Sequence, residues 1–354
     1  MLWLNYFIII SLLLATAAKY FSPQLIWLIA FFGLAFPFIF LANFAFIIYW
    51  VIQFRRLLLL SLIAALIAMP TVSKFIQFNS QKVDTTRKPI RITSYNSMLF
   101  DLYNWSHNKE TRAKIFENLV DLNSDIICFQ EFYTSEEKND FNNIDSLTKL
   151  LNLGNYHTEY TTTLREFDHW GMATFSRFPI INRGKIMFRT RTNNLCIYTD
   201  ILMRKDTVRV YNMHLQSISF SKKDNEFLAN LKKDTEFDDD VEMSKNILRR
   251  LKRAFLKRTK QVDVIKTHMS TCGYKIILCG DFNDTPASFA YNQLSEKLND
   301  AFLSKGYGFG RTYAGSWPQF RIDYILLDPA FTCNKFQRAE ETFTDHFPIT
   351  AHFY

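Results

Sequence analysis

The sequence predicts an α/β domain that is preceded by transmembrane helices. One observation is that short apolar, β-rich runs alternate with helical patterns from residue 90 onward. The other is that residues 1–69 carry only three fully charged side chains, Lys19, Arg55 and Arg56. A chain of 354 residues, 48% of them hydrophobic, has room for a domain of ordinary size with a membrane segment in front of it.

The three charges separate three apolar runs, residues 2–18, 25–52 and 57–69. The first two approach or exceed the ~20 residues that a spanning helix needs, and the third reaches that length only by extending towards Phe78. We therefore expect a membrane anchor of three transmembrane helices over residues 1–78, with Pro37 kinking the second. A signal peptide is the alternative for the first run, but the basic segment that should precede it is missing.

A multi-pass anchor leaves open which membrane face carries the catalytic domain. Arg55 and Arg56 favour a cytoplasmic loop and an exported domain, whereas four cations between residues 74 and 88 favour the reverse. The polar segment 79–89 ends in a proline, which is typical of a linker. The catalytic domain is then expected over residues 90–354.

Several elements of this domain are predicted from hydrophobic periodicity. Residues 111–122 and 145–153 have helical spacing, and residues 196–203 and 207–211 have the pattern of paired strands around a turn at 205–206. Four strand-like runs are also followed by residues that can bind metal or phosphate. The runs are 125–129, 207–211, 275–279 and the neighbourhood of Phe343, and the groups after them are 130–131, 212–214, 280–283 and 344–346.

Because a strand aims the residue at its C-terminal end, these four strands could bring their polar groups to one cleft. Carboxylate and amide oxygens suit a hard cation such as Mg²⁺, whereas imidazoles suit proton transfer. On an extended chain, Asp281 and Asn283 would share one face, and the alternative is that they cap a turn.

Seven motifs, in this order, resemble the endonuclease/exonuclease/phosphatase family of metal-dependent phosphoesterases. They lie at residues 95–96, 130–131, 171–179, 212–215, 280–283, 321–324 and 345–348. Any one of these motifs is weak evidence, but the ordered set is hard to explain otherwise. The resemblance implies a four-layer α/β/β/α sandwich with the site at one end of two stacked sheets.

The resemblance also implies roles for the motif residues. The implied ligands of Mg²⁺, or of Mn²⁺ in its place, are Asn96, Glu131 and Asp345. The implied catalytic residues are His214, Asp281, Asn283, Asp323 and His346. Asp281 and Asn283 would orient the attacking water and hold the phosphate, and Asp323 would orient His346 and raise its proton affinity.

Two features of the predicted site stay open. Arg311 and Arg321 could line the substrate end of the cleft, although surface arginines are common. The histidine at position 214 resembles the motif of the family branch that contains deoxyribonuclease, neutral sphingomyelinase and inositol-polyphosphate phosphatases. The spacing does not decide whether its partner carboxylate is Glu166 or Asp168.

A polar insertion over residues 217–269 carries a cluster of cations between residues 249 and 260. Leu248, Leu251 and Phe255 lie at helical intervals, which favours a surface helix whose apolar stripe packs on the sandwich. The alternative is a basic face, over residues 248–260, that contacts lipid headgroups or nucleic acid, and the net charge of +8 allows either.

We therefore expect a membrane-anchored, divalent-metal-dependent phosphodiesterase that acts on nucleic acid. One alternative is a phosphoesterase for phospholipid or inositol-phosphate headgroups. A second is a non-catalytic binding protein, tethered to the bilayer, on the same fold.

Overall fold

The computed structural model describes residues 1–80, 83–137, 141–188, 192–218, 237–315 and 318–354. The chain forms two compact units, and neither is continuous in sequence. The helical unit comprises Met1–Ile76, Gln216–Val262 and Asp284–Glu296, and the sheet unit comprises Gln77–Leu215, Asp263–Asn283 and Lys297–Tyr354.

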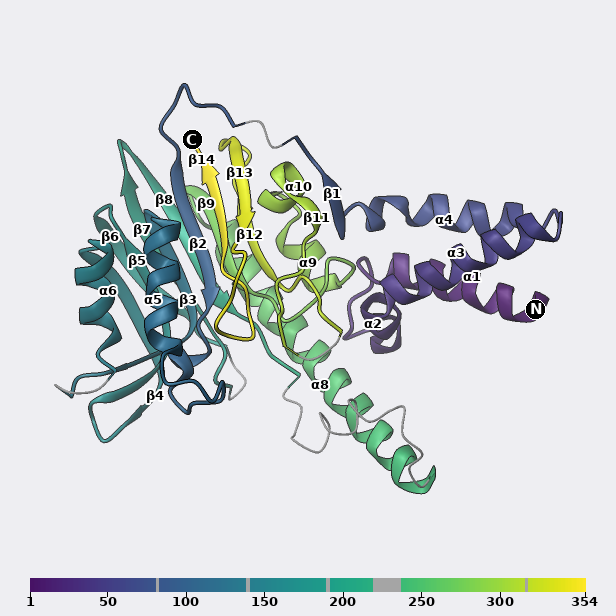
Figure 1. Cartoon of the computed structure of the whole chain (residues 1–354), viewed down its shortest axis with the longest axis horizontal. Coiled ribbons are helices and arrows are strands. Elements are labelled where there is room, and N and C mark those ends of the chain that lie inside the picture. The colour runs from purple at the N-terminus through teal and green to yellow at the C-terminus, as the bar shows by residue number, and fades with distance from the viewer. Residues whose placement is uncertain (81–82, 138–140, 189–191, 219–236, 316–317) are drawn as a thin grey trace. The chain divides into compact units, whose positions relative to one another are not determined.

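Two six-stranded sheets build the sheet unit (Figure 1). The first contains, in spatial order, β10 (Asn299–Asp300), β12 (Asp323–Leu327), β9 (Lys275–Asp281), β8 (Asp206–His214), β7 (Leu195–Met203) and β6 (Ile180–Ile186). The second contains β13 (Cys333–Arg338), β14 (Ile349–Phe353), β2 (Ile90–Asn96), β3 (Ile126–Ser135), β5 (Asp168–Ser176) and β4 (Asn155–Leu164). Both sheets are mixed, because β8 and β9 pair in parallel, as do β2 and β3.

The two sheets stack on a shared apolar core. Ile92 and Ile126 of the second sheet pack in one buried cluster with Val210, Ile277 and Ile325 of the first. The other face of the second sheet packs against the helices α5 (Thr111–Leu122) and α6 (Asn143–Leu151), which contribute buried leucines to a separate cluster. The expected sandwich of two stacked sheets is therefore confirmed.

Local sequence explains where several elements begin and end. The predicted helix over 111–122 is confirmed as α5, and β7 and β8 form the predicted antiparallel pair. Helix α6 begins two residues before the predicted 145, because the side chain of Asn142 accepts a hydrogen bond from the N–H of Asp145 at 3.0 Å. Short elements complete the unit: β1 (Ile76–Phe78) pairs with β11 (Tyr307–Phe309), and the others are η1 (Met98–Asp101) and α10 (Ala301–Lys305).

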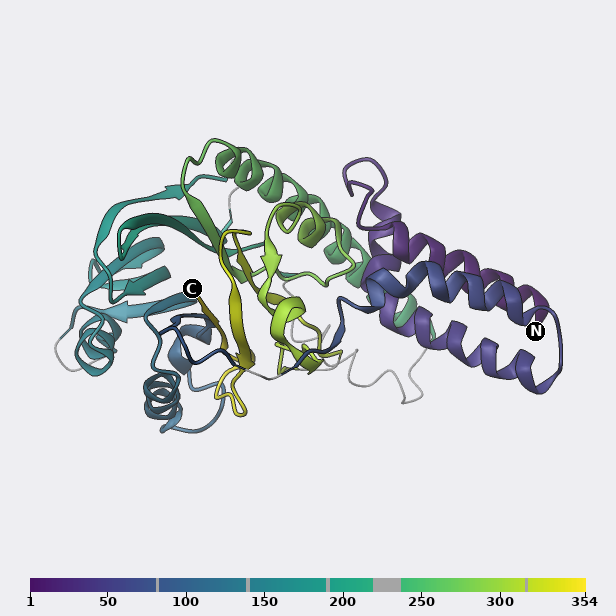
Figure 2. The ribbon, with the colours of Figure 1, turned by 90° about the horizontal axis from the view of Figure 1, so that it is seen from above.

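The helical unit contains four apolar helices, which are α1 (Leu2–Ala17), α2 (Trp27–Leu34), α3 (Phe36–Ile52) and α4 (Leu58–Val72). Helices α1, α3 and α4 lie side by side in both views (Figures 1 and 2). The second apolar run is not one kinked helix as predicted, since α2 and α3 meet at 65° across a break at Ala35. Tested by length and hydropathy, no helix of the described chain qualifies alone as a membrane span, whereas the bent α2–α3 pair meets both criteria together.

These four helices bury an apolar cluster and a few polar groups, and they expose further apolar side chains. Inside, Ser61 donates to the Asn5 side chain at 2.8 Å, and the side chain of Asn43 donates to the backbone carbonyl of Ser61 at 3.0 Å. Outside, Phe7 and Leu66 are each 61% exposed. The exposed apolar side chains differ from the outer face of a water-soluble bundle, which is polar.

Two further helices contribute to the helical unit: α8 (Phe237–Ser270), whose last turns belong to the sheet unit, and α9 (Phe289–Leu294). The predicted apolar stripe of α8 needs correction, because Leu248 is 50% exposed. The buried stripe is Ile247, Leu251 and Phe255, and it packs against α2, where Phe31 meets Phe255 with ring centroids 5.2 Å apart. This part of α8 therefore packs on a helix and not, as predicted, on the sandwich.

Candidate active site

The structure brings the polar groups at several strand ends to one edge of the sheet unit. Asn96 is the last residue of β2, His214 the last of β8 and Asp281 the last of β9, while Asp323 is the first residue of the antiparallel neighbour β12. Parallel pairing places the C-terminal ends of neighbouring strands at the same edge. His214 and Asp281 are therefore register partners, and Asp323 is opposite Asp281 on the other side.

Asp281 is the residue on which the contacts converge. Its Oδ2 accepts a hydrogen bond from Nδ2 of Asn96 at 3.2 Å and lies 3.6 Å from Nε2 of His214 and 3.7 Å from Nε2 of His346. Burial raises the pKa of the Asp281 carboxyl, and the charge of Asp323 adds to this rise, while the two imidazoles oppose it. A carboxyl with a raised pKa is suited to accept a proton from water.

Asn283 does not continue β9 in the extended form that we predicted. Its φ is +51°, in the left-handed region, and its backbone N–H donates to Oδ1 of Asp281 at 2.8 Å. The Asn283 side chain donates to the carbonyl oxygen of Leu215 at 3.0 Å. Asp281 and Asn283 therefore form a side-chain-capped turn, which was the alternative, since Asn tolerates the left-handed conformation that such a turn requires.

Glu131 lies within β3 and not at its end. The register with β5 shifts between Phe129 and Phe132, and Glu131 has a φ of +48°, so the residue occupies a β-bulge. A bulge re-aims a side chain without ending the strand. The Glu131 side chain is 38% exposed, and its Oε1 lies 3.8 Å from Nε2 of His214. The bulge thus places a solvent-accessible carboxylate beside a buried imidazole.

His346 reaches the site from a loop, which corrects the prediction that a strand near Phe343 delivers it. Residues 339–348 connect β13 to β14, and His346 forms only an isolated bridge with Tyr313. Nδ1 of His346 lies 2.9 Å and 3.1 Å from the two carboxylate oxygens of Asp323. Burial alone would lower the pKa of His346, but the charges of Asp323 and Asp281 overcome it and hold that pKa well above its ordinary value.

His214 has no hydrogen-bond partner for its buried Nε2 within the described residues. The carboxylates near this atom belong to Glu131 and Asp281. Asp168, one of the two partners left open by the sequence, instead accepts from the hydroxyl of Tyr133 at 2.7 Å and pairs with Arg165 at 2.6 Å. An imidazole nitrogen that is buried without an internal partner is available to a ligand.

The donor set fits a divalent cation. Single ligand atoms of Asp281, Asp323 and His346 all lie within 4.8 Å of one another. This group differs from the predicted ligands Asn96, Glu131 and Asp345. Asp323 and His346 also bind each other, through Nδ1 of the imidazole, and a hard cation prefers oxygen donors.

Asp345 belongs electrostatically to the same site. Burial raises the pKa of its carboxyl, and the charges of Glu131 and Asp281 raise it further, against the opposing effect of His346. Mutual repulsion among these carboxylates is what a bound cation would relieve.

The two predicted substrate arginines are engaged within the protein. Arg321 is buried, donates to Asp300 at 2.6 Å and lies over the rings of Phe302 and Tyr324. Arg311 donates to the side chain of Gln319 and remains exposed. Neither arginine contacts a predicted catalytic residue through a hydrogen bond described in this structure.

Two amides next to the predicted ligands form a support that the sequence did not predict. Gln130 and Asn212 are fully buried, and Nε2 of Gln130 donates to Oδ1 of Asn212 at 2.7 Å. Asn212 also donates to the backbone carbonyls of Phe129 and Ala173, at 3.1 Å and 2.9 Å. Because Asn212 lies on β8 and the other residues lie on the second sheet, these bonds join the two sheets beneath the site. Uncharged polar residues in otherwise apolar strands are the signal that could have revealed this support.

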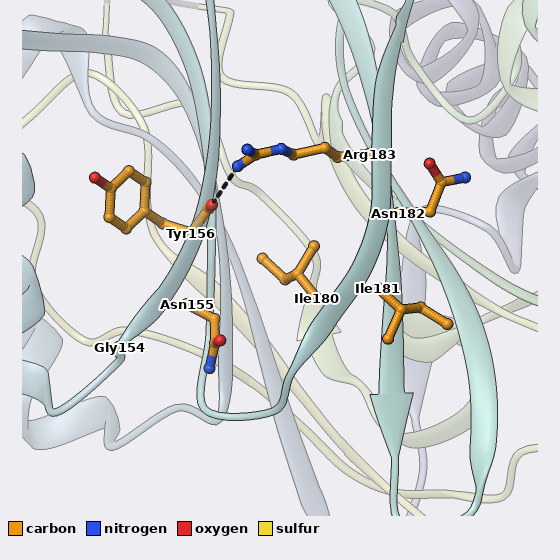
Figure 3. A pocket seen from close by; sticks show the side chains of 7 residues that line it. All are labelled: Gly154, Asn155, Tyr156, Ile180, Ile181, Asn182 and Arg183. Carbon is orange, nitrogen blue, oxygen red and sulfur yellow. Dashed lines mark hydrogen bonds between the residues drawn. The ribbon is translucent and has the colours of Figure 1, made fainter.

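A hollow of about 600 Å³ opens between the edge strands β4 and β6 (Figure 3). Its lining residues are Gly154, Asn155, Tyr156, Ile180, Ile181, Asn182 and Arg183. None of them belongs to the predicted site. Arg183 donates to the carbonyl oxygen of Tyr156 across the hollow, so the one cation there is already engaged with the backbone.

Comparison with known proteins agrees with this geometry. A sequence model described as the Endonuclease/Exonuclease/phosphatase family matches residues 94–346. The chain belongs to this family. A second model, described as a domain of unknown function, matches residues 1–75. No curated protein matches the sequence.

Solved structures of the endonuclease/exonuclease/phosphatase family share the fold. A family member from Beutenbergia cavernae aligns with a TM-score of 0.53 at 13% identity, over 75% of this chain and 72% of its own. Humanized D. rerio TDP2 aligns with a TM-score of 0.52 at 16% identity, over 75% and 99% of the two chains. The human Nocturnin catalytic domain aligns with a TM-score of 0.50 at 18% identity, over 77% and 95%.

The family and the site together define the chemistry. A phosphoesterase needs groups that bind metal, orient water and handle protons, and the sheet unit assembles carboxylates, amides and two imidazoles at one edge. The protein is therefore a hydrolase of phosphate esters, with a buried group of carboxylates and imidazole that is consistent with a metal site.

Proposed function

We propose that the protein is a Mg²⁺-dependent phosphodiesterase that its helical unit holds in a membrane. The convergence of Asn96, His214 and His346 on one oxygen of Asp281 carries the catalytic part of this proposal. Glu131, Asn96 and Asp345 would hold the cation, which when bound supplies positive charge to the phosphate oxygens. Mn²⁺ would be expected to replace Mg²⁺ at such a set of oxygen donors.

The remaining residues have separate roles in the hydrolysis. Asp281 and Asn283 orient the attacking water, and Asp281 takes a proton from it as the new P–O bond forms. His346, kept protonated by Asp323, presents a positive charge to a non-bridging oxygen. His214 donates a proton to the leaving oxygen as the old P–O bond breaks, so the reaction is balanced without another reactant.

Nucleic acid is the substrate class that we propose first. A structure of D. rerio TDP2 complexed with a single-strand DNA product has this fold, with a TM-score of 0.50 at 16% identity. A phospholipid headgroup is the second candidate. It is favoured by the packing of the cationic helix α8 on α2, where the ammonium of Lys252 lies 4.2 Å from the centroid of the Trp27 ring.

A substrate panel tests the catalytic proposal. The full chain in detergent would be assayed with single-stranded DNA, RNA, sphingomyelin, phosphoinositides and simple monoesters, in Mg²⁺ and in EDTA. Phosphodiester cleavage that EDTA and Glu131→Gln both abolish is expected. Cleavage of monoesters alone, or activity that persists in EDTA, would contradict the proposal. Preference for phospholipid over DNA would select the second candidate.

The polarity of the helical unit supports the membrane part of the proposal. In a bilayer, apolar side chains face lipid, while polar groups find partners inside the bundle. The exposed Phe7 and Leu66 and the buried Asn5–Ser61–Asn43 hydrogen bonds have this arrangement. The segments α1, α2–α3 and α4 would then correspond to the three expected membrane segments.

Charge insertion distinguishes a lipid-facing surface from a water-facing one. Leu66→Arg would place a cation on the exposed side of α4, where it costs roughly 2.5–3.5 kcal/mol in a bilayer but little in water. Leu150→Arg is the matched control, since Leu150 is similarly exposed on α6 of the sheet unit. We expect Leu66→Arg, and not Leu150→Arg, to reduce recovery of the chain in alkali-washed membranes. Equal recovery of the two variants would refute the membrane proposal.

A further inference from the structure

Two buried polar side chains on α8 hold the segment that follows β8. Oε1 of Gln261 accepts a hydrogen bond from the backbone N–H of Gln216 at 2.9 Å. Nη1 of Arg258 donates to the backbone carbonyl of the same residue, also at 2.9 Å. Residues three apart on a helix lie on one face, so α8 satisfies both backbone groups of Gln216 at once.

Arg258 also holds the segment that follows β9. Its Nε donates to Oδ2 of Asp284 at 3.0 Å, and the two side chains are 1% and 7% exposed. Oδ1 of Asp284 accepts from the N–H of Thr285 at 3.0 Å. A buried ion pair is weak evidence for stability, because the loss of hydration offsets much of the attraction. The position of the Arg258–Asp284 pair is therefore more informative about its role than its contribution to stability.

The residue that α8 holds in each segment lies within two residues of a predicted catalytic residue. Gln216 follows His214 by two residues, and Asp284 is next to Asn283. Within the sheet unit, the N–H of Leu215 donates to the carbonyl of Asp281 at 2.9 Å, and the Asn283 side chain donates to the carbonyl of Leu215. The exits of β8 and β9 are thus joined to each other by hydrogen bonds, and Arg258 binds the next residue of both.

We infer that Arg258 is a positioning residue that fixes the geometry of His214 and Asn283 by holding both strand exits. This inference rests on the proposed function. A guanidinium can bind two acceptors in fixed directions, whereas an ammonium cannot reproduce the fork. A displacement of about 1 Å at reacting groups can cost about 100-fold in rate. The loss of Arg258 should therefore lower kcat, although we assign Arg258 no contact with the substrate.

The test compares Arg258→Met and Arg258→Lys in the full chain. Arg258→Met should lower kcat by about 10- to 100-fold with KM within about twofold. Arg258→Lys should recover part of the loss, because it retains the charge beside Asp284. The matched control is Arg209→Met, which removes another Arg–Asp pair with Nε–Oδ1 at 2.6 Å, from β7 and β8. The control should lower the unfolding midpoint and leave kcat unchanged at an equal folded fraction.

A second readout does not depend on activity. In protein with ¹⁵N-labelled histidine, the His214 imidazole signals should move in Arg258→Met and stay in place in Arg209→Met. If kcat and these signals respond no more to Arg258→Met than to Arg209→Met, Arg258 is a structural ion pair only and the inference is wrong. If the wild type cleaves no phosphodiester, the proposed function fails, and the histidine signals alone decide on Arg258. Should Arg258→Met not fold, Arg258→Lys takes its place in both readouts.

Discussion

Replacing Asp323 by Asn tests how the site sets the protonation of His346. The carboxylate contacts Nδ1 of His346 at 2.9 Å and 3.1 Å, and both side chains are buried. Asn has nearly the same volume, so the substitution removes a charge with little change in packing. The structure then allows the effect on the pKa of His346 to be worked out.

A hydrogen bond to a charged group contributes roughly 1.5–3 kcal/mol, and one pKa unit corresponds to about 1.4 kcal/mol. The pKa of His346 should therefore fall by roughly one to two units in Asp323→Asn. In the proposed mechanism protonated His346 is the active form, so the alkaline limb of the pH–rate profile should move to lower pH by this amount. The charge of Asp323 also raises the pKa of Asp281, so the acidic limb should move in the same direction.

The assay is kcat/KM against pH for wild type, Asp323→Asn, His346→Ala and the control Asp200→Asn, which alters a buried carboxylate paired with Arg209. Asp323→Asn should approach wild-type rates at low pH and fall about 10- to 100-fold below them at high pH. His346→Ala should lose about 10²–10⁴-fold at every pH. An unmoved alkaline limb, or a loss in Asp323→Asn as large and as pH-independent as in His346→Ala, would refute the reasoning.

Three further predictions concern the metal, the end of β9 and the acid stability. Glu131→Gln should remove Mg²⁺ binding in calorimetry while the unfolding midpoint of the metal-free protein stays unchanged; retained binding would exclude Glu131 as a ligand. Gly280→Ala should prevent folding or lower the unfolding midpoint strongly, because φ is +145° and a Cβ would lie 1.9 Å from the carbonyl oxygen of Met213; a wild-type midpoint would contradict the backbone conformation of Gly280. Burial and two neighbouring cations lower the pKa of His352 to about 4, so the folded state should lose stability as the pH falls from about 6.5 towards 4. His352→Gln should reduce this loss by roughly 1–2 kcal/mol, allowing for the partial exposure of the ring, and identical acid unfolding curves would refute the assignment.

Much of the sheet unit was predictable because it depends on local sequence. Apolar runs identified β3, β8 and β9, since alternation and burial in a strand have a period of two residues. The polar groups after two of these runs located His214 and Asp281, because parallel strands end at a common edge. The run near Phe343 located His346, although a loop and not a strand carries it. The family resemblance added Asn96 and Asp323, which local pattern alone could not connect.

Other features depended on neighbours that are distant in sequence. The bulge at Glu131 arises from the register between β3 and β5, and no residue in the run marks it. His346 arrives from a loop and is fixed by Asp323, 23 residues earlier. The left-handed turn at Asn283 depends on the Asp281 side chain accepting its backbone N–H. In each of these three cases the local geometry differs from the one that the sequence predicted.

The sequence by itself predicted several strands of the two sheets, the candidate residues for metal and proton binding, and the apolar character of the first 70 residues. Only the tertiary structure decided which surface each helix covers and what holds the strand exits. Helical periodicity shows that one face of α8 is buried, but not that its partner is α2 or that Arg258 and Gln261 bind Gln216. The physical reason is that periodicity records how much surface is buried along one element, whereas the partner is chosen by packing and hydrogen bonding between segments far apart in the chain.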